Sequence, residues 1–293
     1  MAFRRPEMND LEPLEIDTDV FLYDQCALPP LPGVVNRLRD MMCSEEINVS
    51  EIANLIKTDP ALVAQILKIV NSAYYSFPQE ILEINFAIAY LGISEVYRVV
   101  LALSVINTLA IGNTHGFRQF WKHSNYTALC TKFITSRYAP LLPLEKLWSA
   151  AILHDIGKLI YMKFFPEHYT VLTNYCAANG ELFSHAEAHF ALPSSADLGM
   201  LLCERWRLPG RIKDACQYHS LGDLQRRMGN SVTDEFIRMV TIGNLLAILL
   251  EDPLNNDVRG TITSQVRIAL KLDTTSLLDL MDEIRGLHHL SIP

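Results

Sequence analysis

The sequence predicts an all-α protein, and three features of the 293-residue chain support this prediction. Apolar residues recur three or four positions apart along most of the chain, which is the period of a helix with one buried face. Capping residues and prolines separate these segments, whereas no alternating apolar and polar run is long enough to demand a strand. The hydrophobic fraction of 49% and the charged fraction of 20% are ordinary for a globular protein with a sizeable core.

The chain begins with a segment for which no helix is predicted. Residues 7–24 are acidic and lack a clear period, so they are expected to form an exposed tail or a strap. Pro29, Pro30 and Pro32 follow. Because each proline fixes its own φ and biases the preceding residue away from the helical region, these prolines predict an extended segment.

Capping residues divide the rest of the N-terminal third into short helices. Ser50 is expected to be the N-cap of one helix, and Asp59 the N-cap of the next, with Pro60 at its first position. Gly92 is expected to end another helix. The helices predicted in this part cover residues 34–42, 51–57, 60–70, 84–91 and 94–111.

The remaining two thirds of the chain also read as helices. The polar stretch 221–232, which contains Gly222 and Gly229, is the one softer boundary, and it is equally compatible with a loop inside one domain. The helices predicted in this part cover residues 117–138, 145–164, 167–179, 184–190, 194–206, 210–219, 234–250, 261–270 and 276–285.

Charge argues against a nucleic-acid partner. The formal net charge of -8 repels phosphate backbones and disfavours non-specific binding. Residues 48–71 superficially resemble a helix-turn-helix, but the second helix offers only Gln65 and Lys68 as exposed polar contacts. No nucleic-acid partner is therefore expected.

The sequence also predicts a cytoplasmic protein. The N-terminus has no apolar core behind Arg4 and Arg5, so no signal peptide is expected. The most apolar run, 99–111, is shorter than the ~20 residues that a bilayer span needs. The six cysteines lie far apart without a CxxC pair, which is typical of buried thiols in a reducing compartment.

The segment His154-Asp155-Ile156-Gly157-Lys158 is the most informative part of the sequence. A neutral imidazole beside a carboxylate suits Zn, Fe, Mn or Ni and can polarise a bound water. Gly157 allows a neighbouring helix or a ligand to come close, and Lys158 can meet a phosphate as a point charge. An isolated His-Asp pair is nevertheless more often a polar helix end.

Three further polar residues extend this set. His123, on the preceding long helix, can face the same seam as His154, and His219 is a candidate from a later helix. Asn244 interrupts an apolar helix face and needs a partner if it is buried. Mutual hydrogen bonds explain these residues as well as a metal site does, so both interpretations stay open.

These residues and their surroundings resemble the HDOD family, which belongs to the HD superfamily of metal-dependent phosphohydrolases. The segments and residues that carry the resemblance are Leu28-Pro29-Pro30-Leu31-Pro32, Asp59-Pro60-Ala61-Leu62, Leu67, Asn71-Ser72-Ala73, Ala87-Ile88, Leu91-Gly92, Phe120-Trp121-Lys122-His123-Ser124, His154-Asp155-Ile156-Gly157-Lys158, Glu187, Gly199, Trp206-Arg207-Leu208-Pro209 and His219.

The resemblance implies a multi-helix HD-like bundle with an N-terminal helical HDOD subdomain. On this interpretation residues 1–23 are a tail and residues 24–225 form the HDOD domain. Residues 226–293 are then a C-terminal helical extension packed on the same domain.

The resemblance also implies a degenerate metal site. Catalytic HD proteins use a His, a His-Asp pair and a distal Asp as ligands. His123, His154 and Asp155 fall at the first three positions, whereas the distal position falls on Asn244, a neutral and poorer ligand.

Other positions bear on the same question. Ser195 and Ser220 stand where two-metal relatives, such as cyclic-di-GMP phosphodiesterases, are expected to have histidines. If Asp234 or Glu235 supplied the missing carboxylate, an enzyme would be favoured.

The expected function is that of a non-catalytic bacterial signal-transduction or scaffold module. It would act through a signalling protein partner or a small phosphate or nucleotide ligand. The alternative is a metal-dependent phosphohydrolase acting on a nucleotide or another phosphate ester. That enzyme would hold one divalent transition metal (Fe, Mn, Zn or Ni) at His123, His154 and Asp155, with Lys158 and His219 near the phosphate.

Overall fold

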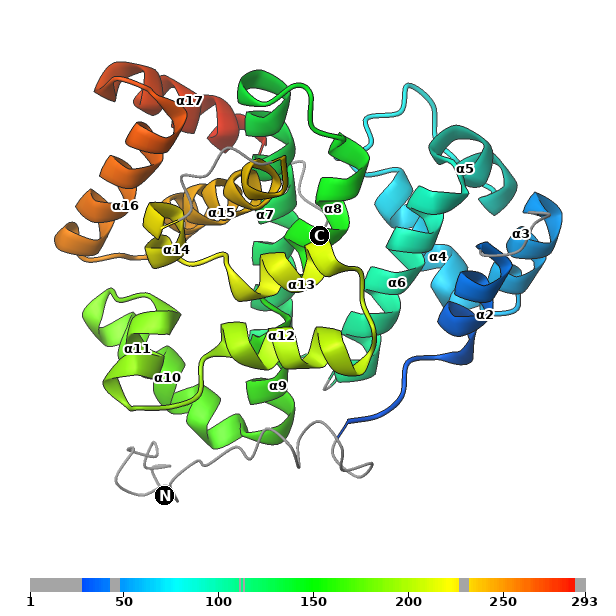
Figure 1. The fold of residues 1–293 in the computed structure, drawn as a ribbon, viewed down its shortest axis with the longest axis horizontal. Helices are drawn as coiled ribbons and strands as arrows, with labels where there is room; N and C mark the ends of the chain where they lie inside the picture. The colour runs from blue at the N-terminus through cyan, green and yellow to red at the C-terminus, as the bar shows by residue number, and fades with distance from the viewer. Residues whose placement is uncertain (1–27, 43–47, 111, 113, 227–231, 288–293) are drawn as a thin grey trace.

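Every regular element in the residues that the computed structural model describes is a helix (Figure 1). These residues are 28–42, 48–110, 112, 114–226 and 232–287. The all-α prediction is confirmed. The predicted tail over 7–24 lies outside the described residues, as do Cys26 and Cys43.

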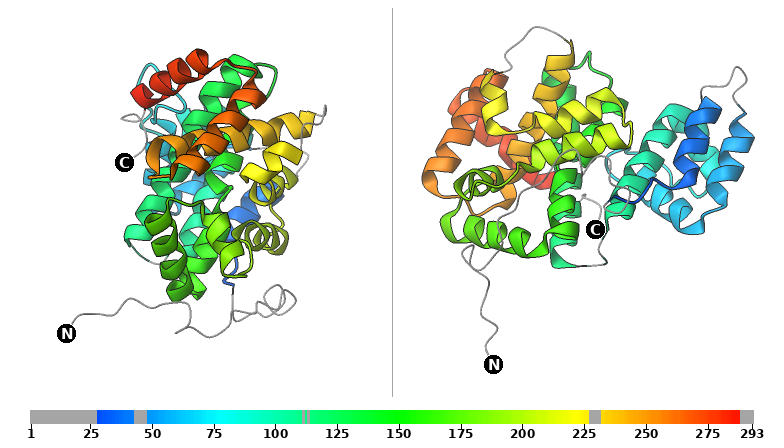
Figure 2. Two further views of the ribbon diagram at one scale, coloured as in Figure 1. Left: turned by 90° about the vertical axis from the view of Figure 1, so that its left-hand side faces the viewer. Right: turned by 60° about the horizontal axis from the view of Figure 1, so that its bottom comes forward.

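Five helices form an N-terminal lobe, which stands apart from the rest of the molecule in Figure 2. The long helix α6 is buried along most of its length and packs against α2, α4 and α5. The lobe consists of α2 (Gly33–Met42), α3 (Val49–Lys57), α4 (Pro60–Val70), α5 (Ile84–Leu91) and α6 (Ile93–Leu109).

Local capping chemistry sets the limits of these helices. Asp59 accepts a hydrogen bond from the Leu62 backbone N–H, as predicted. The prediction for α3 was wrong, because the N-cap is Asn48, whose side chain accepts from the Ser50 and Glu51 backbone N–H groups. An Asn side chain reaches these orphan donors as well as Ser does. Gly92 ends α5 at φ +79°.

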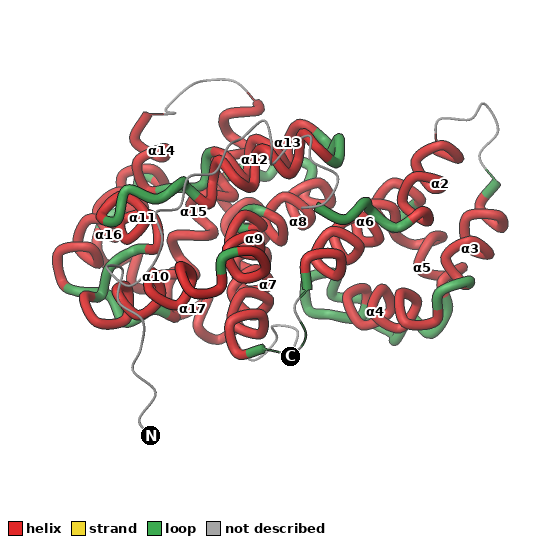
Figure 3. The backbone as a smooth tube through the Cα atoms, turned by 90° about the horizontal axis from the view of Figure 1, so that it is seen from below, coloured by secondary structure: helices red, strands yellow, loops and turns green. Residues whose placement is uncertain are grey.

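Eleven further helices of the described chain make up the larger C-terminal lobe. Figure 3 shows α2–α6 at one end of the molecule and α14–α16 at the other, with α7, α8 and α9 between them. Its helices are α7 (His115–Tyr138), α8 (Leu144–Leu153), α9 (Ile156–Phe164), α10 (Pro166–Asn179), α11 (Phe183–His189), α12 (Ser195–Arg205), α13 (Gly210–Gln217), α14 (Leu221–Arg226), α15 (Val232–Glu251), α16 (Asn256–Leu270) and α17 (Thr274–Leu287).

The predicted continuous helix over 145–164 was wrong in one important respect. The chain breaks between α8 and α9, at His154 and Asp155. Adjacent side chains on a straight helix diverge by about 100°. The break removes this divergence and lets both side chains face one seam.

Three other boundaries differ from the prediction. The helix expected over 210–219 ends at Gln217, which leaves His219 in a connection, and α14 occupies the first part of the stretch 221–232. The third difference is the start of α16. There Asn255 caps α16 by accepting from the Val258 N–H, so this helix begins before residue 261.

The two lobes share one continuous core. The proline-rich segment is extended, and Leu28 and Leu31 in it are buried. Trp206, in the connection after α12, donates its indole N–H to the Pro29 carbonyl at 3.2 Å. On the opposite side, the Tyr74 hydroxyl donates to the Leu144 carbonyl at 2.8 Å. The segment after α4 is thereby tied to the start of α8.

Within the described ranges, no single helix has both the length and the apolar character needed to cross a membrane. Helices α5 and α6 meet these criteria only when taken together, and they are bent by 118° relative to each other.

Candidate functional site

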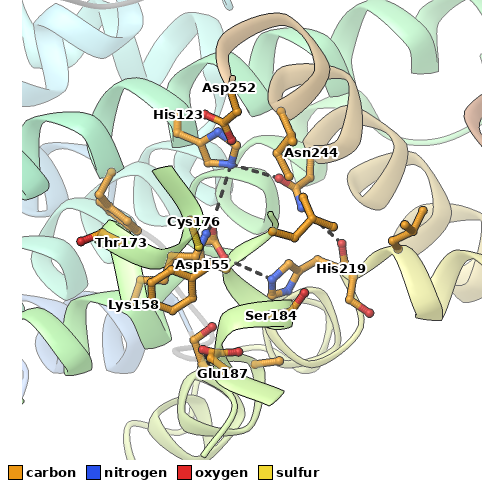
Figure 4. Close-up of a pocket in the computed structure, with 18 of the residues that line it drawn as sticks. His123, Asp155, Lys158, Thr173, Cys176, Ser184, Glu187, His219, Asn244 and Asp252 are labelled. Atoms are coloured by element: carbon orange, nitrogen blue, oxygen red, sulfur yellow. Dashed lines mark hydrogen bonds and ion pairs between the residues drawn. The ribbon is translucent and has the colours of Figure 1, made fainter. Parts of the chain in front are cut away.

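A cavity of about 800 Å³ opens in the C-terminal lobe, between α7, α9, the ends of α10 to α12, and α15. Figure 4 shows the polar side chains that converge in it from these elements. His123, Asp155, Lys158, His219 and Asn244 line the cavity. The structure therefore brings together residues that the sequence separates by more than a hundred positions.

His154 lies at the break between α8 and α9 and is buried. Its Nδ1 lies 2.7 Å from the Ala151 carbonyl oxygen, which can only accept a hydrogen bond, so Nδ1 carries the proton. Burial lowers the pKa of His154, although the neighbouring Asp155 acts in the opposite direction. Its Nε2 is buried and has no hydrogen-bond partner. A neutral ring with a free Nε2 lone pair is the form that binds a metal.

Asp155 is surrounded by cationic and proton-donating groups. Its Oδ2 lies 2.6 Å from the Lys158 ammonium, and its Oδ1 lies 3.1 Å from His219 Nε2. Burial alone would raise the pKa of Asp155, but Lys158 and the histidines outweigh it and hold the pKa well below its usual range. The carboxylate is therefore ionised and already compensated by the protein.

His219 is oriented by its own backbone. Its Nδ1 lies 2.8 Å from the Cys216 carbonyl, so the opposite nitrogen points toward Asp155. Burial lowers the pKa of His219, but the hydrogen bond to Asp155 outweighs this effect and raises the pKa overall. His219 thus faces the carboxylate as a donor.

Asn244 in α15 fixes the state of His123 in α7. The Asn244 Nδ2 donates to the His219 carbonyl at 3.2 Å, and this contact orients the amide. Its Oδ1 therefore faces His123 Nε2, at 3.0 Å. Since an amide oxygen only accepts, His123 Nε2 must donate. In this arrangement Nε2 has no lone pair to offer a metal.

Two glycines allow the helices to approach this closely. A Cβ at Gly157 would lie 1.8 Å from the Ser195 carbonyl oxygen, so α9 can meet the first turn of α12 only without a side chain there. A Cβ at Gly243 would lie 2.1 Å from Thr131 Oγ1, and its absence brings α15 against α7. The close approach predicted for Gly157 is confirmed, with a helix as the neighbour.

Glu251 is an acidic residue at the site that the sequence analysis missed. Glu251 Oε2 lies 3.6 Å from His123 Nδ1, and its other oxygen pairs with Lys122 at 3.1 Å. Burial raises the pKa of Glu251, but His123 and Lys122 outweigh it and lower the pKa to about 2. The spacing contained a signal for this residue. Position 251 lies two helical turns after Asn244, on the same face of α15.

Glu187, one of the positions that carry the family resemblance, was not chosen as a site residue. Its carboxylate accepts from the Ser195 backbone N–H at 2.7 Å, and the buried side chain is part of the cavity wall. Burial raises the pKa of Glu187 to about 7, despite the opposing hydrogen bond from Ser195. The resemblance included Glu187 and placed Ser195 at a position expected to hold a histidine, but it did not indicate that the two residues are in contact.

Asp234 and Glu235, the alternative sources of a carboxylate, lie at the start of α15. Both lie in the first turn of α15, and neither is among the residues that line the cavity. Glu235 pairs with Arg238 at 3.0 Å. The carboxylate nearest to His123 on α15 is therefore Glu251, at the opposite end of the helix.

A family match now identifies the fold. The HDOD domain family matches residues 28–221. The chain belongs to the HDOD family. A Treponema pallidum protein of uncharacterised function is 21% identical to this HDOD chain over 192 residues. That match covers 66% of the chain but only 37% of the relative.

Solved structures share the HDOD fold. A Geobacter sulfurreducens HDOD domain protein of unknown function has a TM-score of 0.69 at 22% identity, with 94% of this chain and 97% of that chain covered. A Shewanella amazonensis protein whose name proposes a phosphohydrolase has a TM-score of 0.67 at 20% identity. The match covers 93% of this chain and 94% of that chain. A Marinobacter aquaeolei protein whose name proposes signal transduction scores 0.66 at 18% identity. The match spans 95% of this chain and 60% of that one.

His123, His154 and Asp155 are the residues that could bind a metal ion. One ligand atom from each of His123, His154 and Asp155 lies within 4.8 Å of the other two, and His154 Nε2 is free. These features fit one divalent transition ion, for which an imidazole and carboxylate set is suitable. Lys158 and the donating His123 Nε2 compete with such an ion. The site therefore fits a single, weakly held metal that would polarise a bound water.

Proposed function

We propose that this chain is a non-catalytic HDOD signalling or scaffold module that acts through a protein partner. The observation that carries the proposal is the contact between Asn244 Oδ1 and His123 Nε2 at 3.0 Å. This contact uses the ligand nitrogen as a hydrogen-bond donor. The family resemblance, in addition, implies a distal carboxylate of catalytic HD proteins at the position of Asn244, whose amide is neutral.

The charges around Asp155 support the same proposal. The Lys158 ammonium at 2.6 Å supplies the positive charge that a metal would otherwise supply. An ion entering the site would have to displace this ammonium or tolerate its repulsion. Metal-assisted hydrolysis would therefore begin with a cost that two-carboxylate sites do not have.

A metal-dependent phosphohydrolase is the second candidate, and one observation favours it. His154 Nε2 is buried 3.3 Å from Asp155 Oδ2 but has no hydrogen-bond partner, and an unsatisfied buried acceptor costs about 1–3 kcal/mol unless something binds it. In such an enzyme His123, His154 and Asp155 would hold the ion. Lys158 and His219 would lie next to a nucleotide or another phosphate ester.

Elemental analysis of the purified protein distinguishes the two candidates. We expect the wild-type chain to retain well below one transition metal ion per chain. The Asn244→Asp variant adds a second carboxylate to the imidazole and carboxylate set, and the extra negative charge favours a divalent ion, so we expect it to retain about one ion. His115→Ala, at the exposed start of α7, is the matched histidine control and should behave like wild type.

The opposite result would favour the enzyme. If the wild-type chain holds one ion, loses it in the His154→Ala and Asp155→Ala double variant, and hydrolyses bis(p-nitrophenyl) phosphate only when loaded, the non-catalytic proposal is wrong.

A further inference from the structure

The N-terminal lobe exposes an apolar face that its own core does not use. Leu82, Phe86 and Tyr90 are exposed by 70%, 56% and 68%. Phe86 and Tyr90 lie one turn apart on α5, with the exposed Asn85 and Ala89 beside them. Leu82 lies two residues before the helix begins. We call Leu82, Phe86, Tyr90 and the neighbouring Glu80 and Glu83 the α5 face.

The side of α5 opposite to this face packs into the core of the lobe and stabilises the helix. Ile84, Ala87 and Ile88 are buried against the rest of the lobe. Packing in the lobe therefore does not require large apolar residues at 82, 86 and 90. Solvent-exposed apolar side chains grouped in this way usually mark an interaction site.

Charge indicates which partner fits this face. From residue 69 to residue 97 the chain contains no Lys or Arg but three glutamates, at 80, 83 and 95. Glu95 is buried and paired with Arg98 at 2.7 Å. Glu80 and Glu83 are exposed and border the apolar side chains, so the rim of the face is acidic. A partner with lysine or arginine beside its apolar residues would complement this rim.

The α5 face is also connected to the interior of the molecule. The ring centroids of Tyr90 and Phe77 lie 5.5 Å apart, and Phe77 stacks on Tyr75 with ring centroids 6.3 Å apart. Tyr75 in turn lies 6.4 Å from Trp148 in α8, the helix that ends at His154. A partner on this face would therefore touch an aromatic row that continues to the junction of the lobes.

We infer that the α5 face is the docking site for a basic amphipathic helix of a partner protein, which would place its apolar side on Phe86 and Tyr90 and its basic residues on Glu80 and Glu83. An amphipathic helix binds a partner through apolar anchors on successive turns. Figures 1 and 3 place α5 in the lobe away from α14, α15 and α16, so docking would leave the cavity accessible. This inference rests on the proposed partner-dependent function and supplies the class of partner.

A peptide titration tests the inference. The probes are three labelled helical peptides of about 18 residues, long enough for several turns. One has leucine on one side and lysine on the other, the second has glutamate in place of lysine, and the third is a scrambled version of the first. Fluorescence anisotropy with the full chain should show binding of the first peptide and at least roughly tenfold weaker binding of the other two.

Variants assign the binding to the face. Phe86→Ala with Tyr90→Ala should weaken the lysine peptide at least roughly tenfold, as expected for two anchor residues. Glu80→Lys with Glu83→Lys should reverse the preference in favour of the glutamate peptide. Leu278→Ala is the matched control, because Leu278 on α17 is 56% exposed and should have no effect. Circular dichroism checks that each variant is folded.

Several results would overturn the inference. The first is equal affinity of wild type and the Phe86→Ala, Tyr90→Ala variant, or no binding of the lysine peptide. Others are a dimer that the Phe86→Ala, Tyr90→Ala change dissociates, or adsorption to phosphatidylcholine vesicles that this change abolishes. These would assign the face to a second copy or to a lipid surface. None of these measurements depends on metal, so a failure here leaves the elemental analysis of the site unaffected.

Discussion

Lys158 Nζ lies 2.6 Å from Asp155 Oδ2, one helical turn away in sequence, and the carboxylate is buried whereas the lysine is half-buried in the wall of the cavity. The pKa of Lys158 would be lowered by burial, but Asp155 outweighs this effect and raises it. The pair is therefore fully ionised, and each partner compensates the charge of the other.

Replacement of Lys158 by Met should destabilise the protein by about 3–5 kcal/mol, because it leaves a buried carboxylate without its main counter-charge. Added Mn²⁺ or Zn²⁺ should restore part of the loss by occupying the vacated position. Urea unfolding with and without the ion measures both effects. Lys213→Met is the control, since Lys213 and Glu204 form an exposed pair at 3.2 Å. A surface pair of this kind contributes at most about 1 kcal/mol. A Lys158→Met protein as stable as wild type would contradict the compensating role of Lys158.

Periodicity was sufficient for the helices because their apolar faces are local in sequence. The same reasoning failed at His154 and Asp155, where an apolar pattern continues through a break in the helix. The break depends on a side-chain contact, from His154 to the Ala151 carbonyl, which a period cannot express.

The site shows a similar division. His123, His154, Asp155, Lys158, His219 and Asn244 were all chosen from the sequence, and the structure places them together. Glu187 was not chosen as a site residue, because its role depends on the approach of α11 to the start of α12. The orientation of the Asn244 amide depends on a backbone carbonyl 25 positions away in sequence, so no local pattern indicates it.

Addition of a methyl group at Gly157 should have a large effect. A Cβ there would lie 1.8 Å from the Ser195 carbonyl oxygen, which is backbone and cannot rotate away. We expect Gly157→Ala to cost about 3 kcal/mol or more in the free energy of unfolding. Gly260→Ala in α16 is the opposite case, because nothing lies within 4 Å of its Cβ. That change should stabilise the protein by about 0.5–1 kcal/mol, since alanine favours the helix. Chemical denaturation of both variants measures the difference, and equal effects would contradict the close contact of α9 with α12.

Glu187 should make stability depend on pH. Its pKa rises from 4.5 to about 7 on folding, so the folded state takes up the proton first as the pH falls. The stabilisation is complete below about pH 4.5 and is lost as the pH rises through about 7, with an upper limit of roughly 3 kcal/mol. Glu187→Gln stays neutral and can still accept from the Ser195 N–H. Compared with wild type, it should be similar near pH 5 and more stable above pH 7.

Thermal denaturation at several pH values measures this difference between the two proteins. Contributions from Asp155, His154 and His219 are common to both proteins and cancel in the comparison. Glu204→Gln changes an exposed glutamate and should follow the wild-type curve. Parallel curves for wild type and Glu187→Gln from pH 5 to pH 8 would mean that Glu187 is ionised throughout. The Glu187 carboxylate in the cavity wall would then add a negative charge to the site at neutral pH.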